Sequence, residues 1–512
     1  MLILCVVLFL TFLDNTIVSV VLANVQSTLA AGVVDLQWVL DAYMLAFAVF
    51  MLSGGTLGDL LGRKKVMLSG VGLFVAGSIV AAAANSIDTL IAGRIIMGLG
   101  AAASEPGTLS MIRHIYPKAR SRSKALGIWA AVSGIALAFG PIIGGVIVGF
   151  SSWRGVFIFS VIFGVLALIA GWIFLPESSD RKGRKLDLIG LSLGGLSIST
   201  AAIAVILGEN QSYLSPLILF LFVLAVISLL AFILYERKQS DPVLQLSLFK
   251  IPKFSIANTI AFNANFGIFA VFFFVALYLQ FIAGYSGYLI AVSFISMTAA
   301  IVVSSILTGR IYKLKRTIPL IVIGSLLSGG GIFILRQVIH PNVTAAALSW
   351  TLALTGFGFG ILLVVMTSSV LGIVSAKRSG MAASSVNTFR ELGGVFGVAV
   401  LGSIVNAQLN GGLTAKLQAL HLPTNFQSFV IYAVTHGGHT PQAAHISIAE
   451  LASHAALINQ VTGVAYKAFG HGLTIALYIA GSLLLLSGVI GATYMTIGYL
   501  IPKGCGATTK DS

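Results

Sequence analysis

The stretch "GGTLGDLLGRKKVM" occupies residues 54–67, directly after a long apolar run. Its glycines recur every four residues from Gly54 to Gly62, and on a helix they form a smooth stripe that another helix can approach closely. Asp59 and Arg63 lie one turn apart, so they are placed to form an ion pair. A phosphate-binding loop is disfavoured, because no strand precedes the stretch and no Ser or Thr follows its lysines. The stretch therefore predicts a tight, positively charged turn between two closely packed helices.

The whole chain is too apolar for a soluble protein. Of its 512 residues, 57% are hydrophobic and 9% are charged, whereas a soluble domain has about 25% charged residues. Apolar runs long enough to span a bilayer as helices recur along the chain, without the alternation typical of membrane β-barrels. We therefore expect an all-α polytopic membrane protein. Its fourteen expected spans lie near residues 2–22, 36–58, 66–86, 89–112, 124–148, 154–175, 187–207, 213–234, 255–281, 288–308, 318–338, 345–374, 381–408 and 470–499.

Basic residues concentrate in alternate loops between these spans. The loops on one side, with the C-terminal tail, hold 24 of the 30 Lys and Arg residues. By the positive-inside rule that side is cytoplasmic, so both termini are expected there, in a multi-pass protein of the cytoplasmic membrane. The same asymmetry explains the net charge of +15 without a nucleic-acid partner. Cys5 and Cys505 lie at opposite ends and indicate neither a disulfide framework nor a metal site.

Two segments allow other interpretations. Residues 1–22 have the length of a secretory signal peptide, but they lack a basic start and Asp14 interrupts them. The apolar run starts at the first residue, with no polar residue ahead of it, so we expect the natural start of the protein to lie further upstream.

The segment at about 410–468 is expected to be a long outer loop containing a partly ordered hairpin or a short amphipathic helix. Its "HGGHTPQAAH" (436–445) fits no established metal-ligand spacing, so we expect neither a metal nor a cofactor.

The opening stretch resembles the loop signature of the major facilitator superfamily, Gly-x-Leu-Ala-Asp-Arg-x-Gly-Arg-Lys. Gly58 replaces the Ala and Leu60 replaces the Arg after the Asp, which implies a thinner helix-capping charge network. The stretch "LTGRIYKLKR" at 307–316 is a weak match to the same signature, at the equivalent turn of the second half of the chain. The matching residues expected to form the gating motif are Gly55, Leu57, Asp59, Gly62, Arg63 and Lys64.

Two further stretches resemble helix motifs of the same superfamily. In "GRIIMGLGAA" Arg94 matches the helix-4 motif, although Met97 replaces a Gln. "GIWAAVSGIALAFGPIIGG" at 127–145 resembles the helix-5 antiporter motif, which is associated with export, although Ala136 stands where a Gly is usual. Its proline and glycines predict a bent, closely packed helix. The matching residues of this antiporter-helix motif are Gly127, Gly140, Pro141, Gly144 and Gly145.

The number of spans points to the fourteen-helix drug:proton antiporter family. "LDNTIVSVVL" at 13–22 resembles that family's helix-1 motif, and "NTFRELGGVFGVAVLGSI" at 387–404 resembles its penultimate helix. The resemblance implies a major facilitator fold of two six-helix halves, 1–175 and 241–512, related by a pseudo-twofold axis along the membrane normal. It also implies two additional helices between the halves, in 176–240.

Charged residues inside apolar spans are costly and are therefore functional candidates. Asp14 lies near mid-membrane, and Asp14 and Glu105 are the two main candidates for the carboxylate that binds a transported proton. Arg94 and Glu105 are about 16 Å apart along one helix and cannot pair with each other. The structural alternatives are snorkelling for Asp41, helix–helix hydrogen bonds for Glu105, and a mutual pair for Arg390 and Glu391. Because burial favours a neutral carboxyl and a cationic substrate favours a charged one, proton and substrate would compete. The expected coupling residues are Asp14, Glu105, Arg94, Asp41, Glu391 and Arg390.

A Phe-rich span at 262–281 suits a hydrophobic drug, although lipid-facing or packing aromatics are the alternative. Amides avoid lipid, so Asn263, Asn265 and Gln280 are candidates for the substrate cavity. The resemblance implies proton-coupled multidrug efflux of hydrophobic compounds, cationic or neutral, by a monomer in the bilayer. The alternative on the same fold is an exporter of an amino acid, siderophore or sugar. An enzyme or a receptor is disfavoured, because no catalytic motif is present.

Overall fold

The computed structural model describes residues 1–29, 31, 33–178, 187–210, 213–239, 242, 244–285, 287–312, 317–340, 343–374, 379–419 and 455–500. All the long elements in these ranges are helices. The first group comprises α1 (Leu2–Leu29), α2 (Val33–Leu61), α3 (Arg63–Ala82), α4 (Ile87–Ile115), α5 (Ala119–Phe150) and α6 (Arg154–Phe174). Two more helices, α7 (Leu188–Asn210) and α8 (Pro216–Glu236), follow this group.

The second group begins with a short 3-10 turn, η1 (Leu246–Lys250), and a span in three parts. In this span α9 (Pro252–Ala270) passes through a π-helical turn, η2 (Val271–Val275), into α10 (Ala276–Phe281). A single π-turn widens a helix locally and often occurs at functional sites. The remaining helices are α11 (Gly287–Ile311), α12 (Thr317–Val338), α13 (Ala345–Ile373), α14 (Ser379–Ala419) and α17 (Ala455–Leu500).

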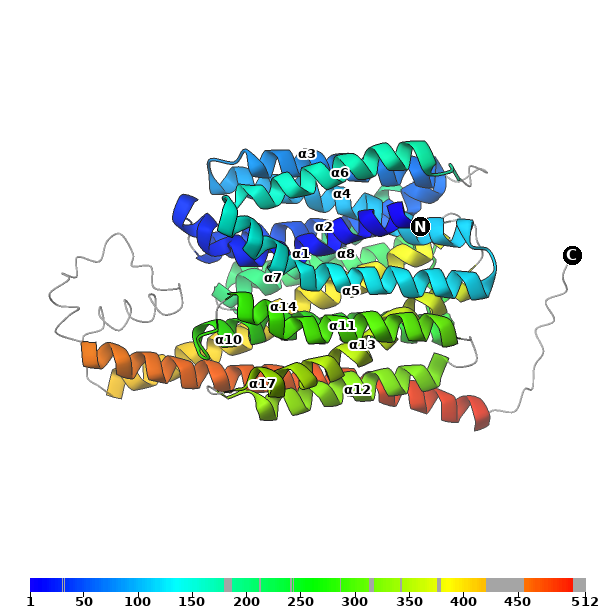
Figure 1. Cartoon of the computed structure of the whole chain (residues 1–512). Coiled ribbons are helices and arrows are strands. Elements are labelled where there is room, and N and C mark those ends of the chain that lie inside the picture. Colours follow the sequence, from blue (N-terminus) through cyan, green and yellow to red (C-terminus); the bar gives the residue numbers. More distant parts are fainter. Residues whose placement is uncertain are drawn as a thin grey trace, which may run out of the picture.

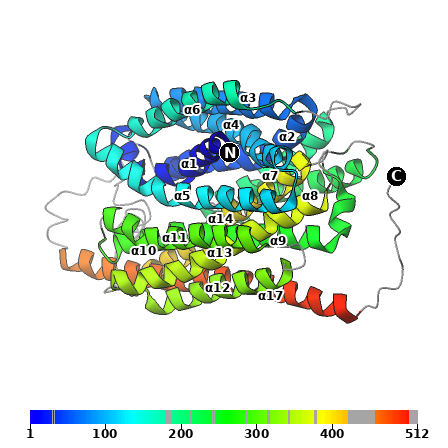
Figure 2. The ribbon, with the colours of Figure 1, turned by 45° about the vertical axis from the view of Figure 1, so that its right-hand side comes forward.

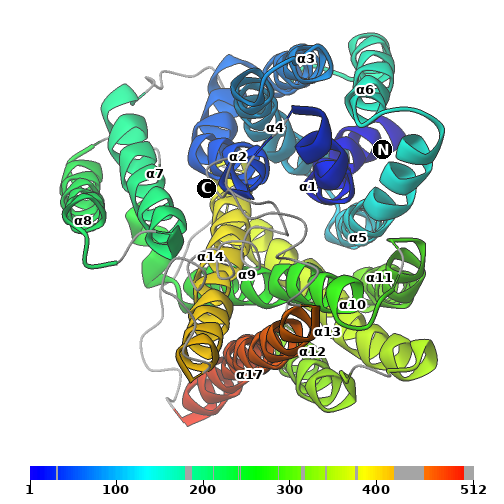
Figure 3. The same cartoon turned by 90° about the vertical axis from the view of Figure 1, so that its left-hand side faces the viewer.

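The helices form one bundle of two groups that meet along a seam. The view along the bundle shows α1–α6 on one side and α9–α17 on the other (Figure 3). Across the seam α5 packs against α11, and α2 packs against α14. α7 packs against both α2 and α14, and α8 packs outside α7. The side views show the long helices running roughly along one common direction (Figures 1 and 2).

The helices match the expected membrane spans. Among the described residues, eleven helices are long and apolar enough to cross a membrane, and the number is thirteen if each of two bent pairs is counted as one span. The bends are 48° in α2, beside Leu52, and 41° in α5, between Leu137 and Ile142. α1 contributes a shorter apolar stretch, Leu2–Val18. Each of the fourteen expected spans coincides with one of these helices, so the all-α membrane fold is confirmed.

The boundaries of the expected outer loop at about 410–468 were wrong. α14 continues to Ala419 and α17 begins at Ala455, and both project beyond the bundle (Figure 1). Leu409, Leu413 and Leu417 recur one turn apart and pack against α17, so the helical structure expected within this segment belongs to extensions of α14 and α17. Residues 420–454, which include "HGGHTPQAAH", lie outside the described residues.

Candidate functional site: buried charges at the seam

Asp14 is paired within the first group of helices. The Nη1 of Arg94 on α4 donates a hydrogen bond to Asp14 Oδ2 on α1, and both side chains are at most 1% exposed. Arg94 Nε donates to the Val39 carbonyl of α2 at 2.8 Å, and its guanidinium carbon lies 4.4 Å from the centre of the Tyr43 ring. The Tyr43 hydroxyl in turn donates to the Thr11 carbonyl of α1 at 3.0 Å. This network ties α1, α2 and α4 together and balances the charge of Asp14.

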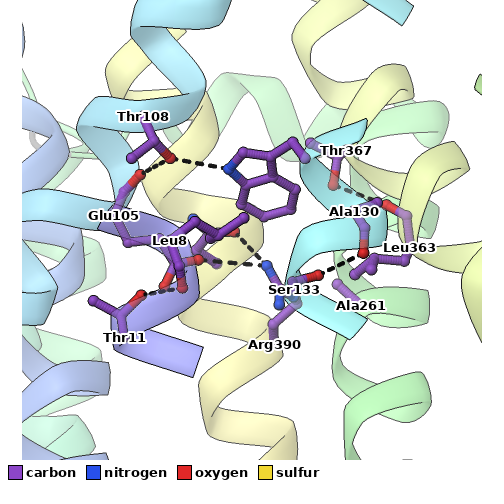
Figure 4. Close-up of polar contacts among 12 residues, drawn as sticks. Leu8, Thr11, Glu105, Thr108, Ala130, Ser133, Ala261, Leu363, Thr367 and Arg390 are labelled. Atoms are coloured by element: carbon purple, nitrogen blue, oxygen red, sulfur yellow. Dashed lines mark hydrogen bonds and ion pairs between the residues drawn. The ribbon is translucent and has the colours of Figure 1, made fainter. Parts of the chain in front are cut away.

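A second ion pair crosses the seam. Arg390 Nη1 on α14 lies 3.5 Å from Glu105 Oε1 on α4, and it also donates to Asn387 Oδ1 at 3.0 Å (Figure 4). The guanidinium carbon lies 4.9 Å from the centre of the Phe12 ring and 5.5 Å from that of Trp129. Arg390 is therefore in contact with both rings of a Phe12–Trp129 pair that meets edge to face, and such contacts stabilise a cation.

The backbone of Glu105 and the Trp129 ring are joined by one hydroxyl. Thr108 Oγ1 donates to the Glu105 carbonyl at 2.7 Å and accepts a hydrogen bond from Trp129 Nε1 at 3.0 Å (Figure 4). The turn of α4 that carries Glu105 is thus fixed relative to α5. Pro106 follows Glu105 and removes a backbone donor there. Sequence reasoning missed Tyr43, Trp129 and Asn387, because nothing in their local spacing shows that they face the charges.

Glu391 lies beside the second pair but is not hydrogen-bonded in it. It is 1% exposed, and neither carboxylate oxygen accepts a hydrogen bond from the described part of the chain. It acts electrostatically on Glu105, and Arg390 acts on it. The structural alternative, a mutual pair of Arg390 and Glu391, is thus not observed, because Arg390 pairs with Glu105 instead. Asp41 lies nearer the start of α2 than Tyr43 and is partly buried.

The amides expected in a substrate cavity lie on α9 and α10. Asn263 Nδ2 donates to Ser487 Oγ of α17 at 3.1 Å, so this amide joins two neighbouring helices. Asn265 Nδ2 donates to the Ala261 carbonyl of its own helix at 2.9 Å. Gln280 belongs to α10, but its side chain lies outside the described residues. The side-chain amides of Asn263 and Asn265 therefore have hydrogen-bond acceptors within the protein, and their contact with a substrate stays a prediction.

The opening motif forms a second contact across the seam, at the end of the bundle that carries the α2–α3 turn. Asp59 accepts hydrogen bonds from Arg63 Nη2 at 2.9 Å and Nε at 3.1 Å, which confirms the expected ion pair. Its other oxygen accepts from the Met381 backbone N–H of α14 at 3.2 Å. Arg113 Nη2 of α4 donates to the Val374 carbonyl after α13 at 2.5 Å. These bonds hold the two groups of helices together at this end.

Glu177 completes the motif, and sequence reasoning missed it. Its carboxylate accepts the backbone N–H groups of Lys64 at 3.1 Å and Lys65 at 3.3 Å. The first turn of α3 contains no acidic residue of its own, so its free N–H groups need an acceptor from elsewhere. The Lys64 ammonium donates to the Trp172 carbonyl at 2.7 Å. Nothing in the local sequence shows that the chain after α6 returns to this turn.

We expect Gly62→Ala to lower the stability of the protein. Gly62 has φ +114°, and a Cβ there would lie 2.8 Å from Glu177 Oε1, so alanine would be both strained and in collision with the cap of α3. The expected loss is roughly 1–2 kcal/mol or more, measured as a lower melting temperature of the detergent-purified protein. The matched control is Gly72→Ala, since a Cβ at Gly72 on α3 meets nothing within 4 Å. Equal melting temperatures for the two variants would contradict this account.

The antiporter-helix motif lies where α5 meets α1 and α11. A Cβ on Gly140 would come within 2.8 Å of the Ile17 backbone nitrogen, and one on Gly127 within 3.0 Å of the Gly309 Cα. The bend in α5 includes Pro141, which confirms the expected bent helix. Gly144 is buried, whereas Gly145 is exposed with nothing within 4 Å of its Cβ position. The expected close packing therefore does not extend to Gly145.

Comparison with known proteins identifies relatives along most of the chain. A family model described as "Major Facilitator Superfamily" matches residues 4–398. The methylenomycin A resistance protein of Bacillus subtilis (strain 168) is 32% identical over 394 residues, which cover 77% of this chain and 84% of that protein. The multidrug resistance protein Stp of Mycobacterium tuberculosis (strain CDC 1551 / Oshkosh) is 30% identical over 474 residues, or 92% and 87% of the two chains.

A solved structure supports the fold alone. The human organic anion transporter MFSD10 aligns with a TM-score of 0.59 and 13% identity, covering 96% of this chain and 99% of that one.

Proposed function

This chain belongs to the Major Facilitator Superfamily, and from that membership we propose that it exports hydrophobic compounds, cationic or neutral, in exchange for protons. The names of its relatives, which are antibiotic and multidrug resistance proteins, support drug export. The observation that carries the proposal is the buried Glu105–Arg390 ion pair across the seam. A transporter that rocks two halves around a central site can be coupled to protons through buried charged groups whose pairing changes with conformation.

The coupling follows from the energetics of buried charge. A carboxylate out of water is stable when it is protonated or when a cation lies beside it. Proton and substrate can therefore replace one another at the same carboxylate, and each would favour a different arrangement of the halves. Asp14 and Glu105 face guanidinium groups, and Glu391 adds a third carboxylate. We assign proton and substrate coupling to this set, with Asp41 as an outer member.

The gating role is assigned to the end that carries the α2–α3 turn. Asp59 bonds to the Met381 N–H, Arg113 to the Val374 carbonyl, and Ser123 Oγ to the Gly309 carbonyl at 3.2 Å, each across the seam. We propose that this end faces the cytoplasm, together with both termini, because the basic loops lie there. These three bonds would then close the cytoplasmic entrance and break when it opens.

The same proposal divides the chain into residues 1–175 and 241–512 as the moving halves, with 176–240 as an inserted pair. α7 packs against α2 of one half and α14 of the other, so it would accompany their motion along one side of the seam. We propose that a single chain is the working unit, because the charges and both helix groups belong to one chain.

The test is transport by inverted membrane vesicles that contain the protein. Ethidium should accumulate when the interior is made acidic, and an uncoupler should abolish the accumulation within the same experiment. Vesicles without the protein provide the background. Ethidium accumulation that is unchanged by the uncoupler would contradict proton coupling. A panel that adds neutral antibiotics, amino acids and sugars separates multidrug export from export of a dedicated metabolite.

A further inference from the structure

The buried charges in the middle of the bundle do not balance. Among the described residues, this region holds Asp14, Arg94, Glu105, Arg390 and Glu391, each at most 1% exposed. Two carboxylates are paired with the two guanidinium groups. Glu391 is left over, and both of its oxygens lack a hydrogen-bond donor in the described part of the chain. With all five groups ionised, the region would carry one uncompensated negative charge.

The groups that face Glu391 come from three helices. Arg390 on its own helix, Glu105 on α4 and Tyr43 on α2 each interact with it electrostatically. The other helices packed against α14 are α7, α9, α13 and α17. α13 contains no ionisable residue, and the ionisable residue of α9 is Lys253 in its first turn. Residues 188–208 of α7 contain none. No ionisable residue in the described part of α17 is among the groups that act on Glu391; these residues are Tyr466, Lys467, His471, Tyr478 and Tyr494.

Arg390 is not free to neutralise two carboxylates equally. Its Nη1 already bonds to Glu105 and Asn387, and its guanidinium group is in contact with the Phe12 and Trp129 rings. Moreover, adjacent residues on a helix point in directions about 100° apart, so their side chains do not face each other. An ionised Glu391 therefore needs one more positive charge, and burial makes that need strong.

We propose that Glu391 is the residue at which one proton and one cationic substrate replace each other. This inference rests on the proposed function and specifies which carboxylate performs the exchange. Asp14 is matched within the first group of helices, and Glu105 is matched across the seam. Glu391 lies on α14, which packs against α2 and α4 at the seam. A cation that enters there would supply the positive charge that an ionised Glu391 lacks.

The experiment measures the affinity of the purified full chain for ethidium as a function of pH, by fluorescence in detergent. If one proton competes with one cation, the dissociation constant rises about tenfold for each pH unit of acidification below the titration point. Glu391→Gln cannot be deprotonated, so we expect its affinity to be weaker and independent of pH. Glu391→Asp should restore the dependence. The double variant Asp14→Asn with Arg94→Met, which leaves no unpaired charge at that pair, should keep it.

The outcomes separate the inference from the proposed function. A wild-type affinity that does not change with pH would reject proton competition and weaken the proposed function as well. A steep dependence that survives in Glu391→Gln, or that is lost in the Asp14→Asn, Arg94→Met double variant, would overturn the assignment to Glu391 and leave proton-coupled export standing. If Glu391→Gln binds no ethidium, Glu391→Asp decides: binding with the tenfold slope supports the inference, and loss of binding in both folded variants rejects it.

Discussion

Replacing Asp14 with asparagine is expected to abolish ethidium export and to destabilise the protein. The variant would leave the Arg94 guanidinium ionised, 1% exposed and without its carboxylate. Removing one partner of a buried ion pair costs about 3–5 kcal/mol. The uncompensated positive charge would also repel a cationic substrate from the middle of the bundle. The measurements are export from cells, uptake by inverted vesicles, and the melting temperature of the purified protein.

The matched control for Asp14→Asn removes both charges. The double variant Asp14→Asn with Arg94→Met leaves no buried unpaired charge, and neutral packing of similar volume often replaces a buried pair without loss of stability. We therefore expect its melting temperature to return most of the way to that of the wild type, while export stays absent. A single variant that melts like the wild type, or that exports ethidium at the wild-type rate, would show that the pair is dispensable.

The sequence was sufficient for features that depend on local spacing or on hydropathy. The spans follow from apolar length, and the Asp59–Arg63 pair follows from one turn of helix. The bend of α5 follows from Pro141 and its glycines. The family resemblance through the opening motif was also confirmed by comparison. In each of these cases the signal lies within about 20 consecutive residues.

Contacts between distant helices could not be predicted in this way. Arg94 and Asp14 were both candidates, but their pairing depends on how α1 lies against α4. Glu105 and Arg390 are 285 residues apart in sequence, and no spacing rule relates them. Glu177 reaches the start of α3 only because α6 returns beside that turn. Pairing of this kind is a property of the packed bundle, and so is the lack of a hydrogen-bond partner for Glu391 among the residues that the structure describes.

Replacing Glu105 with glutamine is expected to reduce export by roughly tenfold or more, because it leaves Arg390 buried without its carboxylate. Arg390→Gln should have a comparable or larger effect, since Glu105 and Glu391 would then both lack the positive charge of Arg390. The double variant, with both residues changed to glutamine, should melt at a higher temperature than either single variant. Their double-mutant cycle should give a coupling of about 1–3 kcal/mol. The measurements are melting temperature and uptake by inverted vesicles.

The two ion pairs differ in a way that a second readout can detect. The Asp14–Arg94 pair joins helices of one group, so it can persist through a rocking motion, whereas the Glu105–Arg390 pair joins α4 to α14 and must lengthen whenever the seam opens there. Loss of the second pair should therefore shift the population of conformations, and loss of the first should not.

A cysteine placed at Ser123, beside the Gly309 carbonyl across the seam, reports this opening through its rate of alkylation. Faster alkylation in the double glutamine variant, with an unchanged rate in the Asp14→Asn, Arg94→Met variant, is expected. Equal rates in the two double variants would contradict a role for Glu105–Arg390 in holding the halves together.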